Sequence, residues 1–317
     1  MAHRPPKTSL YLSEPDSFSP GFNRLIVSWL RNESLVREHQ PAKAFEPVRK
    51  AYDVLLQALV ASGNTPVDAH RAALTSLTPL LLGVDISKFL SGRLDPSLIN
   101  VSGFRTALAQ GSAKNNGENF VNVMVYALGM LLSNQDEVLI DKGAPPKLRE
   151  ALTLVRSVKL ANRTDELKLP IECDFSIFSR TNPLKAIVIN AKTRLKEVFH
   201  VATMWKLLFD SIGDSHCAAK WGLKSSANPA DVTYCFATAD MIPKEGKKTQ
   251  GPDVERAYPR NLIAMDASFF HYVFVSKPDI SHVAKTLAFG ANKKEALFHE
   301  LGCLIDLIMQ KFSIKLP

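Results

Sequence analysis

A chain of 317 residues, 46% hydrophobic and 22% charged, has the composition of a soluble globular protein and can bury one large core or two modest ones. No apolar run reaches the roughly 18 residues that span a bilayer, so we expect an intracellular protein with no membrane partner. The formal charge of +8 favours an anionic partner such as nucleic acid. The four cysteines form no CxxC pair, which argues against a zinc module or a disulfide framework.

Apolar residues recur at helical spacing in the first half of the chain, with proline and glycine between the periodic runs. Residues 21–95 are predicted to form a helical region, residues 112–135 a strong helix, and residues 147–162 a further helix that follows two prolines. Near residue 165 the pattern changes to short β-rich runs. The sequence therefore predicts that a sheet begins there.

Four runs have the composition of strands, and a long helix is predicted between the second and the third. The strands are expected within residues 166–178, 185–192, 231–242 and 261–276, and the helix within residues 193–213. Apolar residues occupy most faces of that helix, which predicts that it is buried.

The chain closes with residues 280–289 and 293–312, which both have helical spacing. The order of elements from residue 112 onward predicts an α/β (α+β) fold in which helices flank a mixed central sheet. We expect a helical N-terminal region over residues 1–110, fused to an α/β core over residues 111–317.

Residues 172–192 combine two strand-like runs, a turn and side chains of opposite charge. Glu172 and Asp174 fall on one face of the first strand, and Asn190 and Lys192 share a face of the second. If the two runs pair as an antiparallel hairpin, Asp174 and Lys192 meet near the end of the sheet. Such a pair is either a surface salt bridge, worth about 0 to 1 kcal/mol, or a place to hold a divalent metal and a phosphate.

The sequence from Glu172-Cys-Asp174 through Asn190-Ala-Lys192 resembles the PD-(D/E)-X-K nuclease superfamily, and more closely the type II restriction endonucleases. The resemblance covers residues 112 to about 280 and implies a restriction-endonuclease-like core. It implies that Asp174 binds Mg²⁺ and that Lys192 activates the attacking water. The elements that follow Lys192 come in the family's order.

Two residues depart from the family pattern. Cys173 stands where the family often has proline, and Asn190 stands where a second acid is usual. The metal site then needs another carboxylate, and the candidates are Glu118, Glu172 and Glu197. Glu118 begins the helix before the hairpin, where an acid is also favoured by the helix dipole alone.

Further residues are predicted to contact DNA. The run after Lys192 looks like a base-reading segment of some restriction enzymes, which implies roles for Lys196 and Glu197, and Arg194 could hold a phosphate. One helical line joins Thr193, Lys196, His200, Thr203 and Asp210, and it could face phosphates or a dimer partner. A basic segment with Lys247 and Lys248 has the composition of a DNA-wrapping loop or of a mobile solvated loop.

These observations predict a Mg²⁺-dependent, sequence-specific endonuclease that cuts double-stranded DNA as a homodimer, with Asp174, Lys192 and Glu118 as catalytic residues and Asp174, Glu118 and Glu172 as metal ligands. A bacterial cytoplasmic location follows from the family resemblance alone. The alternatives are a DNA-binding protein that keeps a nuclease-like core without the chemistry, which Asn190 suggests, and a structure-specific repair nuclease.

Overall fold

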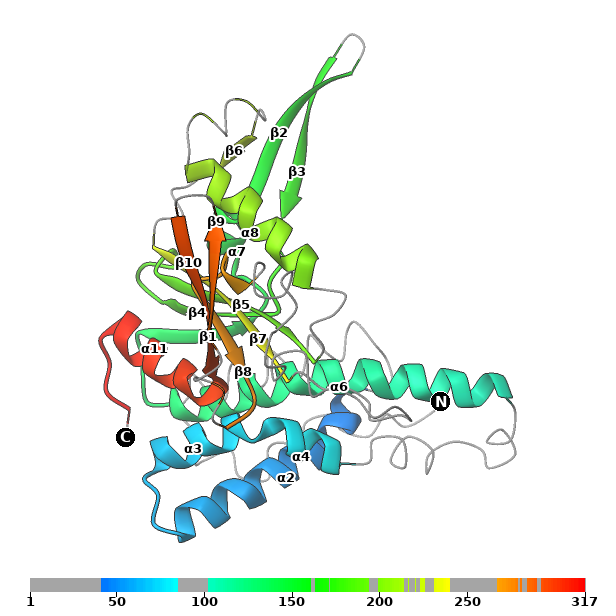
Figure 1. Cartoon of the computed structure of the whole chain (residues 1–317), viewed down its shortest axis with the longest axis vertical. Coiled ribbons are helices and arrows are strands. Elements are labelled where there is room, and N and C mark those ends of the chain that lie inside the picture. The colour runs from blue at the N-terminus through cyan, green and yellow to red at the C-terminus, as the bar shows by residue number, and fades with distance from the viewer. Residues whose placement is uncertain are drawn as a thin grey trace, which may run out of the picture.

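The structure is a computed structural model, and it describes most of the chain in separate ranges. The described residues are 41–84, 102–160, 163–170, 172–193, 199–213, 216, 220, 223–225, 231–239, 267–278, 280, 284–289 and 292–316. Within them, helices lie against a central sheet and a smaller sheet projects from the body (Figure 1). The predicted mixed α/β class, with a mixed central sheet flanked by helices, is confirmed.

Among the described residues, four helices precede the first described strand, as the helical spacing predicts. They are α2 (Pro41–Ala61), α3 (Pro66–Thr75), α4 (Leu77–Gly83) and α6 (Ser102–Leu131). Helix α3 begins where Thr65 accepts the amide N–H of Asp68 at 3.2 Å, with Pro66 at the first position, a common start for a helix. Helix α6 begins at Ser102, ten residues before the predicted start, and it runs through the division expected at residue 110. That division into two parts stays a prediction.

The central sheet has seven strands in the order β1-β4-β5-β7-β8-β10-β9. Their bounds are β1 (Val138–Lys142), β4 (Phe175–Ser179), β5 (Ala186–Lys192), β7 (Val232–Thr238), β8 (Tyr272–Val275), β10 (Asn292–Glu300) and β9 (Ala284–Phe289). Strands β5, β7, β8 and β10 are parallel neighbours, whereas β1, β4 and β5 pair antiparallel. The sheet is therefore mixed, and its parallel centre matches the almost continuous burial of β5.

The helix predicted over residues 147–162 is mostly wrong. Helix α7 (Pro146–Ala151) ends after six residues, and β2 (Thr153–Leu160) follows it. This strand pairs with β3 (Arg163–Pro170) and with β6 (Leu223–Ser225) in a three-stranded sheet, and β2 and β3 extend away from the central sheet (Figure 1). Because eight residues of β2 pair across to β3, strand pairing outweighs the helical spacing of its apolar residues.

The helical spacing of the last two runs is also misleading. Residues 280–289 contain the strand β9, and the first part of residues 293–312 is the strand β10. A 3-10 turn (Leu301–Cys303) and α11 (Leu304–Phe312) follow, so the helix prediction holds only for the end of the run. Strand β10 pairs with β8 on one side and with β9 on the other, and these ladders decide its conformation.

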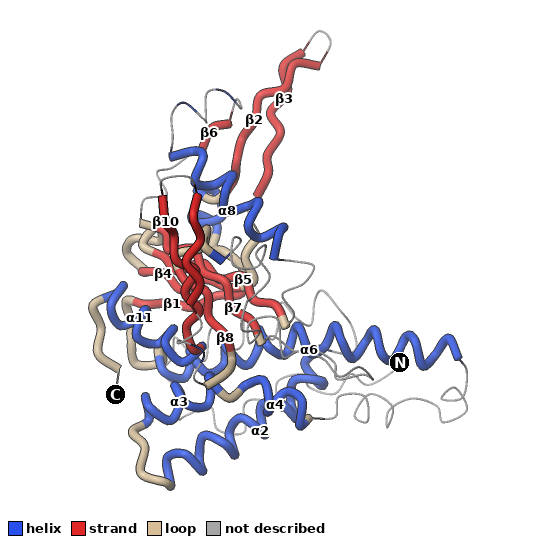
Figure 2. Tube along the Cα trace, in the orientation of Figure 1, coloured by secondary structure: helices blue, strands red, loops and turns tan. Residues whose placement is uncertain are grey.

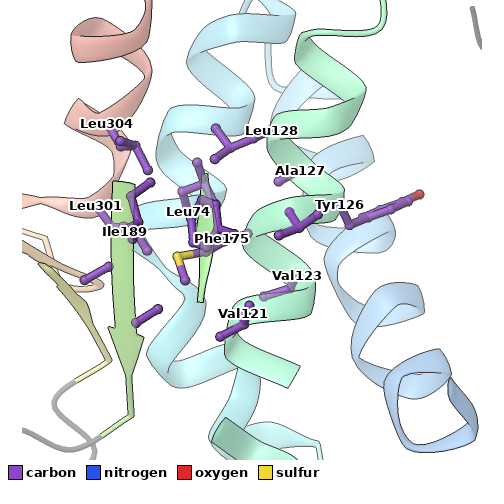
Figure 3. Close-up of a cluster of buried hydrophobic side chains, with 14 of the residues drawn as sticks. Leu74, Val121, Val123, Tyr126, Ala127, Leu128, Phe175, Ile189, Leu301 and Leu304 are labelled. Atoms are coloured by element: carbon purple, nitrogen blue, oxygen red, sulfur yellow. The ribbon is translucent and has the colours of Figure 1, made fainter. Parts of the chain in front are cut away.

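Two hydrophobic clusters cover the two faces of the central sheet. Alternate residues of β5 divide between them, because successive side chains of a strand point to opposite faces: Ile187 and Ile189 belong to one cluster and Val188 to the other. The first cluster joins the sheet to the N-terminal helices and α11, as Figure 3 shows for Phe175 and Ile189 beside Leu74, Tyr126, Leu128, Leu301 and Leu304. The second includes Leu148 of α7 and Ala202 and Phe209 of α8, the helix that lies beside β6 in Figure 2.

Helices α3 and α4 form hydrogen bonds to segments that lie far away in the sequence. The hydroxyl of Thr78 donates to the carbonyls of Ala239 at 2.7 Å and Ser276 at 2.8 Å, and the hydroxyl of Ser276 accepts the N–H of Thr78 at 2.9 Å. The N–H of Gly302 donates to the hydroxyl of Thr75 at 3.2 Å. The first helices thus close against the ends of β7, β8 and β10.

Helix α8 (Phe199–Gly213) is not buried on most faces, contrary to the sequence-based expectation. Ala202 and Phe209 pack into the second cluster, but Val201, Met204 and Leu207 are 46%, 61% and 40% exposed. Thr203 is buried while Asp210 is exposed, so these two members of the predicted polar line do not share an exposed face. None of the described helices is long and apolar enough to cross a membrane.

Candidate active site at the end of strand β5

Asp174 lies immediately before β4, where the main chain fixes it from two sides. Its N–H donates to the carbonyl of Ile189 at 3.0 Å, and its carbonyl accepts the N–H of Gly143 at 3.0 Å. Gly143 has a φ of +76°, which glycine adopts without the steric cost that a side chain would bring. The turn after β1 and the strand β5 therefore hold the backbone of Asp174 between them.

The Asp174 side chain lies against the end of β5. Its Oδ2 accepts the N–H of Ala191 at 2.7 Å, and the Nζ of Lys192 donates to Oδ1 at 3.1 Å and to Oδ2 at 3.0 Å. The β4–β5 hairpin is antiparallel, as predicted, and the predicted meeting of Asp174 with Lys192 is confirmed. Both side chains keep solvent access, with 26% and 32% of their surfaces exposed, so water and a ligand can reach them.

Asn190 lies on the same face of β5 as Val188 and Lys192, and its side chain reaches the neighbouring strand β7. The side chain is 5% exposed, and its Nδ2 donates to the hydroxyl of Tyr234 at 3.0 Å. The Tyr234 hydroxyl in turn donates to the carbonyl of Glu172 at 3.1 Å. The position where the family has an acid thus takes part in a hydrogen-bond chain that ends two residues before Asp174.

The remaining carboxylates predicted at the metal site are placed differently. The side chain of Glu172 is exposed, and Glu118 is half-buried in α6, which packs on the face of the sheet that carries Ile187 and Ile189. Within the part of the chain that the structure describes, no group of three or more His, Cys, Asp or Glu side chains could hold a metal ion. Both glutamates stay candidates for the second acid.

Most of the predicted DNA contacts cannot be placed. Arg194, Lys196, Glu197, Lys247 and Lys248 lie outside the described residues. His200 is the second residue of α8, and its side chain is likewise outside the description. Their roles stay predictions.

The surroundings of Asp174 keep the neighbouring Cys173 thiol neutral. Burial, and then the charge of Asp174, raise the pKa of the Cys173 thiol to about 12, so the residue that replaces the usual proline remains a protonated thiol. Burial also raises the pKa of Asp141, which lies in β1. A protonated thiol is a poor metal ligand, which leaves the oxygens of Asp174 as the candidate donors at this site.

The donor set fits Mg²⁺. This ion prefers oxygen ligands, keeps several of its waters, and is commonly held by one or two carboxylates together with substrate phosphates. Asp174 offers one partly exposed carboxylate, already aligned by the Ala191 N–H, and Glu172 stands two residues earlier with its side chain in solvent. The positive charge of Lys192 beside them suits an anionic substrate.

Sequence reasoning missed two groups that shape this site. The sequence marks Tyr234 only as part of a β-rich run. Its alternation with Val232 and Phe236 predicts that it faces a core. That it meets Asn190 depends on the pairing of β5 with β7, which the local sequence does not encode. The Ala191 N–H belongs to the main chain, so residue types do not reveal it.

The fold and the site define a mixed α/β protein with a carboxylate–lysine pair at the end of a central strand. No family model and no curated protein matches the sequence. Among solved structures, the complex of the restriction endonuclease PspGI with substrate DNA aligns over 87% of this chain and 96% of that chain, at 12% identity and a TM-score of 0.40. A TM-score of this size marks a remote likeness, and no contact or activity is transferred from it.

Proposed function

We propose that the protein is a Mg²⁺-dependent endonuclease of the type II restriction class, which hydrolyses phosphodiester bonds in double-stranded DNA. The observation that supports it is the Asp174–Lys192 pair, which joins a metal-binding carboxylate to an ammonium within 3.1 Å at the accessible end of β5. The sequence resemblance on the same residues and the charge of +8 agree with a DNA substrate.

The proposed hydrolysis adds water to phosphorus. A water oxygen forms a bond to the phosphorus as the water gives up a proton, the bond to the leaving oxygen breaks, and that oxygen takes up a proton, which gives a phosphate end and a hydroxyl end. Bound Mg²⁺ would offset the negative charge that develops on the phosphoryl and leaving oxygens. Asp174 would hold that ion, with Glu172 or Glu118 as the second carboxylate.

Lys192 has the position for two tasks in this reaction. Its ammonium stabilises charge on the non-bridging oxygens and orients the attacking water. In the structure both carboxylate oxygens of Asp174 hold its Nζ, so the ammonium stays at the metal-binding carboxylate. A lysine held in this way needs little reorganisation when a substrate arrives.

We also propose that the protein acts as a homodimer in a bacterial cytoplasm. Palindromic DNA is matched by a two-fold protein, in which each subunit contributes one site. The sequence resemblance is the support for this assembly and this location. Light scattering coupled to size exclusion gives the mass directly, and a mass of one chain at the concentrations used for cleavage contradicts the dimer.

Cleavage of phage DNA tests the function. Purified protein is incubated with Mg²⁺ or with EDTA, beside Asp174→Ala and Lys192→Ala. Discrete fragments that require Mg²⁺ and vanish in both variants support the proposal. Intact DNA in every reaction, with the protein folded and DNA still shifted in a gel, leaves the non-catalytic DNA-binding protein, while fragments without a fixed pattern indicate a structure-specific nuclease.

A further inference from the structure

A buried hydrogen-bond chain runs from β5 through β7 to the segment that carries the site carboxylate. Asn190 donates to the Tyr234 hydroxyl at 3.0 Å, and that hydroxyl donates to the Glu172 carbonyl at 3.1 Å. Tyr234 is fully buried and Asn190 is 5% exposed, so water does not compete for either bond. The chain thus links three segments that lie far apart in the sequence.

The directions of these bonds are mutually consistent. A phenol has one proton, and the Glu172 carbonyl can only accept, so the Tyr234 proton must go to that carbonyl. The phenol oxygen then accepts the amide N–H of Asn190.

Three main-chain bonds and the Tyr234 bond together fix the segment that presents Asp174. The N–H of Asp174 bonds to Ile189, its carbonyl to Gly143, and Ala191 bonds to its carboxylate. These bonds hold residue 174. At residue 172, by contrast, the carbonyl of Glu172 accepts a hydrogen bond from the Tyr234 hydroxyl. Without it, the peptide between residues 172 and 173 can turn, and the two carboxylates change their relative orientation.

We propose that Tyr234 and Asn190 are positioning residues, which fix the Glu172–Asp174 segment so that its carboxylates hold the divalent ion of the proposed nuclease site. This inference rests on the proposed function. It assigns Asn190 a task other than that of a lost ligand: its amide orients Tyr234, and Tyr234 orients the ligand segment. Groups that orient metal ligands in this way typically matter 10- to 100-fold for metal affinity or activity.

Tyr234→Phe removes the hydroxyl and keeps the ring in its packing. We expect the Mg²⁺ concentration that gives half-maximal single-turnover cleavage to rise about tenfold. Binding of Mn²⁺, which shares the preference of Mg²⁺ for octahedral oxygen ligands, should weaken by a similar factor when free Mn²⁺ is followed by electron paramagnetic resonance. Saturating Mg²⁺ should restore most of the cleavage rate, because Tyr234 does not touch the substrate.

Tyr126→Phe is the matched control. Tyr126 is also a buried tyrosine whose hydroxyl donates to one acceptor, Asp53, at 3.0 Å, but it lies in α6 and belongs to the helical side of the molecule. Removal of the Tyr126 hydroxyl should lower the urea midpoint of unfolding about as much as Tyr234→Phe does. It should leave both metal titrations unchanged. A metal effect confined to Tyr234→Phe therefore reports positioning instead of a general loss of stability.

Asn190→Asp is the second variant, which keeps the packing if Tyr234→Phe fails to fold. A carboxylate at position 190 can only accept, so the Tyr234 hydroxyl donates its hydrogen bond to that carboxylate. The Glu172 carbonyl then loses its donor. We expect weaker Mn²⁺ binding, whereas a restored ligand would bind Mn²⁺ more tightly and overturn the inference. Wild-type metal titrations in both variants would overturn it while cleavage by the wild type still stands, and a wild type that neither cleaves DNA nor binds Mn²⁺ overturns both proposals.

Discussion

The ammonium of Lys192 lies within 3.1 Å of both carboxylate oxygens of Asp174, although 18 positions separate the two residues. Both side chains are partly exposed, and an ion pair of this kind contributes at most about 1 kcal/mol to folding. The pair is therefore poorly explained by stability alone. It can be changed with little risk to the fold.

Neutral replacements of this pair separate function from folding. We expect Asp174→Asn and Lys192→Met to lower the single-turnover cleavage rate by roughly 100-fold or more, because each removes a charge that stabilises the reaction, while the urea midpoint changes little. The control is Asp231→Asn, which breaks the Lys311–Asp231 pair at 2.8 Å. Asp231 precedes β7, whereas Lys192 pairs with the last residue of β7, Thr238. Equal losses of cleavage in all three variants would contradict the assignment of the site.

A second ion pair should matter for stability instead. Lys206 is 2% exposed, and its Nζ contacts the carboxylate of Asp210 at 2.6 and 2.5 Å. We expect Asp210→Ala to lower the free energy of unfolding by on the order of 2 kcal/mol, because it leaves a buried ammonium without its partner. The loss is smaller than for a fully buried pair because Asp210 is half-exposed.

Urea unfolding measures this cost. The double variant Lys206→Met with Asp210→Ala removes both charges and should recover most of the lost free energy. A double variant that is less stable than Asp210→Ala would show that the ammonium itself, and not its missing partner, holds the helix in place.

His70 should make stability depend on pH. Burial lowers its pKa from 6.5 to about 4, and the Tyr52 hydroxyl lies 2.7 Å from its Nδ1. In the unfolded chain His70 therefore binds a proton near pH 6.5, whereas in the folded chain it stays neutral at that pH. The contribution of neutral His70 to stability is full above that pH and is lost progressively as the pH falls toward about 4. The loss amounts to about 2 to 3 kcal/mol at about pH 4.5.

The variant His70→Gln isolates this contribution. Burial also lowers the pKa of His271 and of His299, so the wild type alone reports a sum over several groups. The difference between wild type and His70→Gln in urea midpoints, measured from about pH 7 to about pH 4.5, should grow steadily in favour of the variant as the pH falls. A difference that stays constant with pH would show that folding does not lower the pKa of His70.

Gly302 should not tolerate a methyl group. A Cβ at this position would lie 2.5 Å from the carbonyl oxygen of Arg71 and 2.7 Å from the hydroxyl of Thr75. We expect Gly302→Ala to cost about 1 to 3 kcal/mol through overpacking. The control Gly83→Ala has nothing within 4 Å of its new Cβ and should be neutral or slightly stabilising. Thermal unfolding of both variants makes the comparison, and equal midpoints would contradict the close approach of Gly302 to α3.

The hairpin could be predicted because its signals are local. The run from Ala186 to Lys192 is apolar with a polar end, and a turn composition precedes it, so the sequence predicts a hairpin in which Asp174 and Lys192 can meet. Strands β2 and β10 could not be predicted in this way. Their apolar spacing also fits a helix, and pairing with β3 and with β9, which that spacing does not reveal, decides the outcome.

The partner of Asn190 shows the same limit within the site. Tyr234 is 44 positions away, and the two residues meet because β5 and β7 pair in parallel with one register. Alternation predicts which face each residue takes but not how far one strand is shifted along the other. The sequence resemblance therefore predicts an acid at residue 190, and the sequence does not show what the amide of Asn190 does there.

The hydrogen bonds of Thr75 and Thr78 bear on the order in which the chain completes its fold. These residues belong to the part synthesised first, yet they are fastened to Ala239, Ser276 and Gly302. Contacts between residues so far apart form slowly and only after the later segments exist. On the ribosome, the full set of these bonds of α3 and α4 can form only after residue 302 has been synthesised, whereas α2 and α6 are available earlier to pack against the two helices.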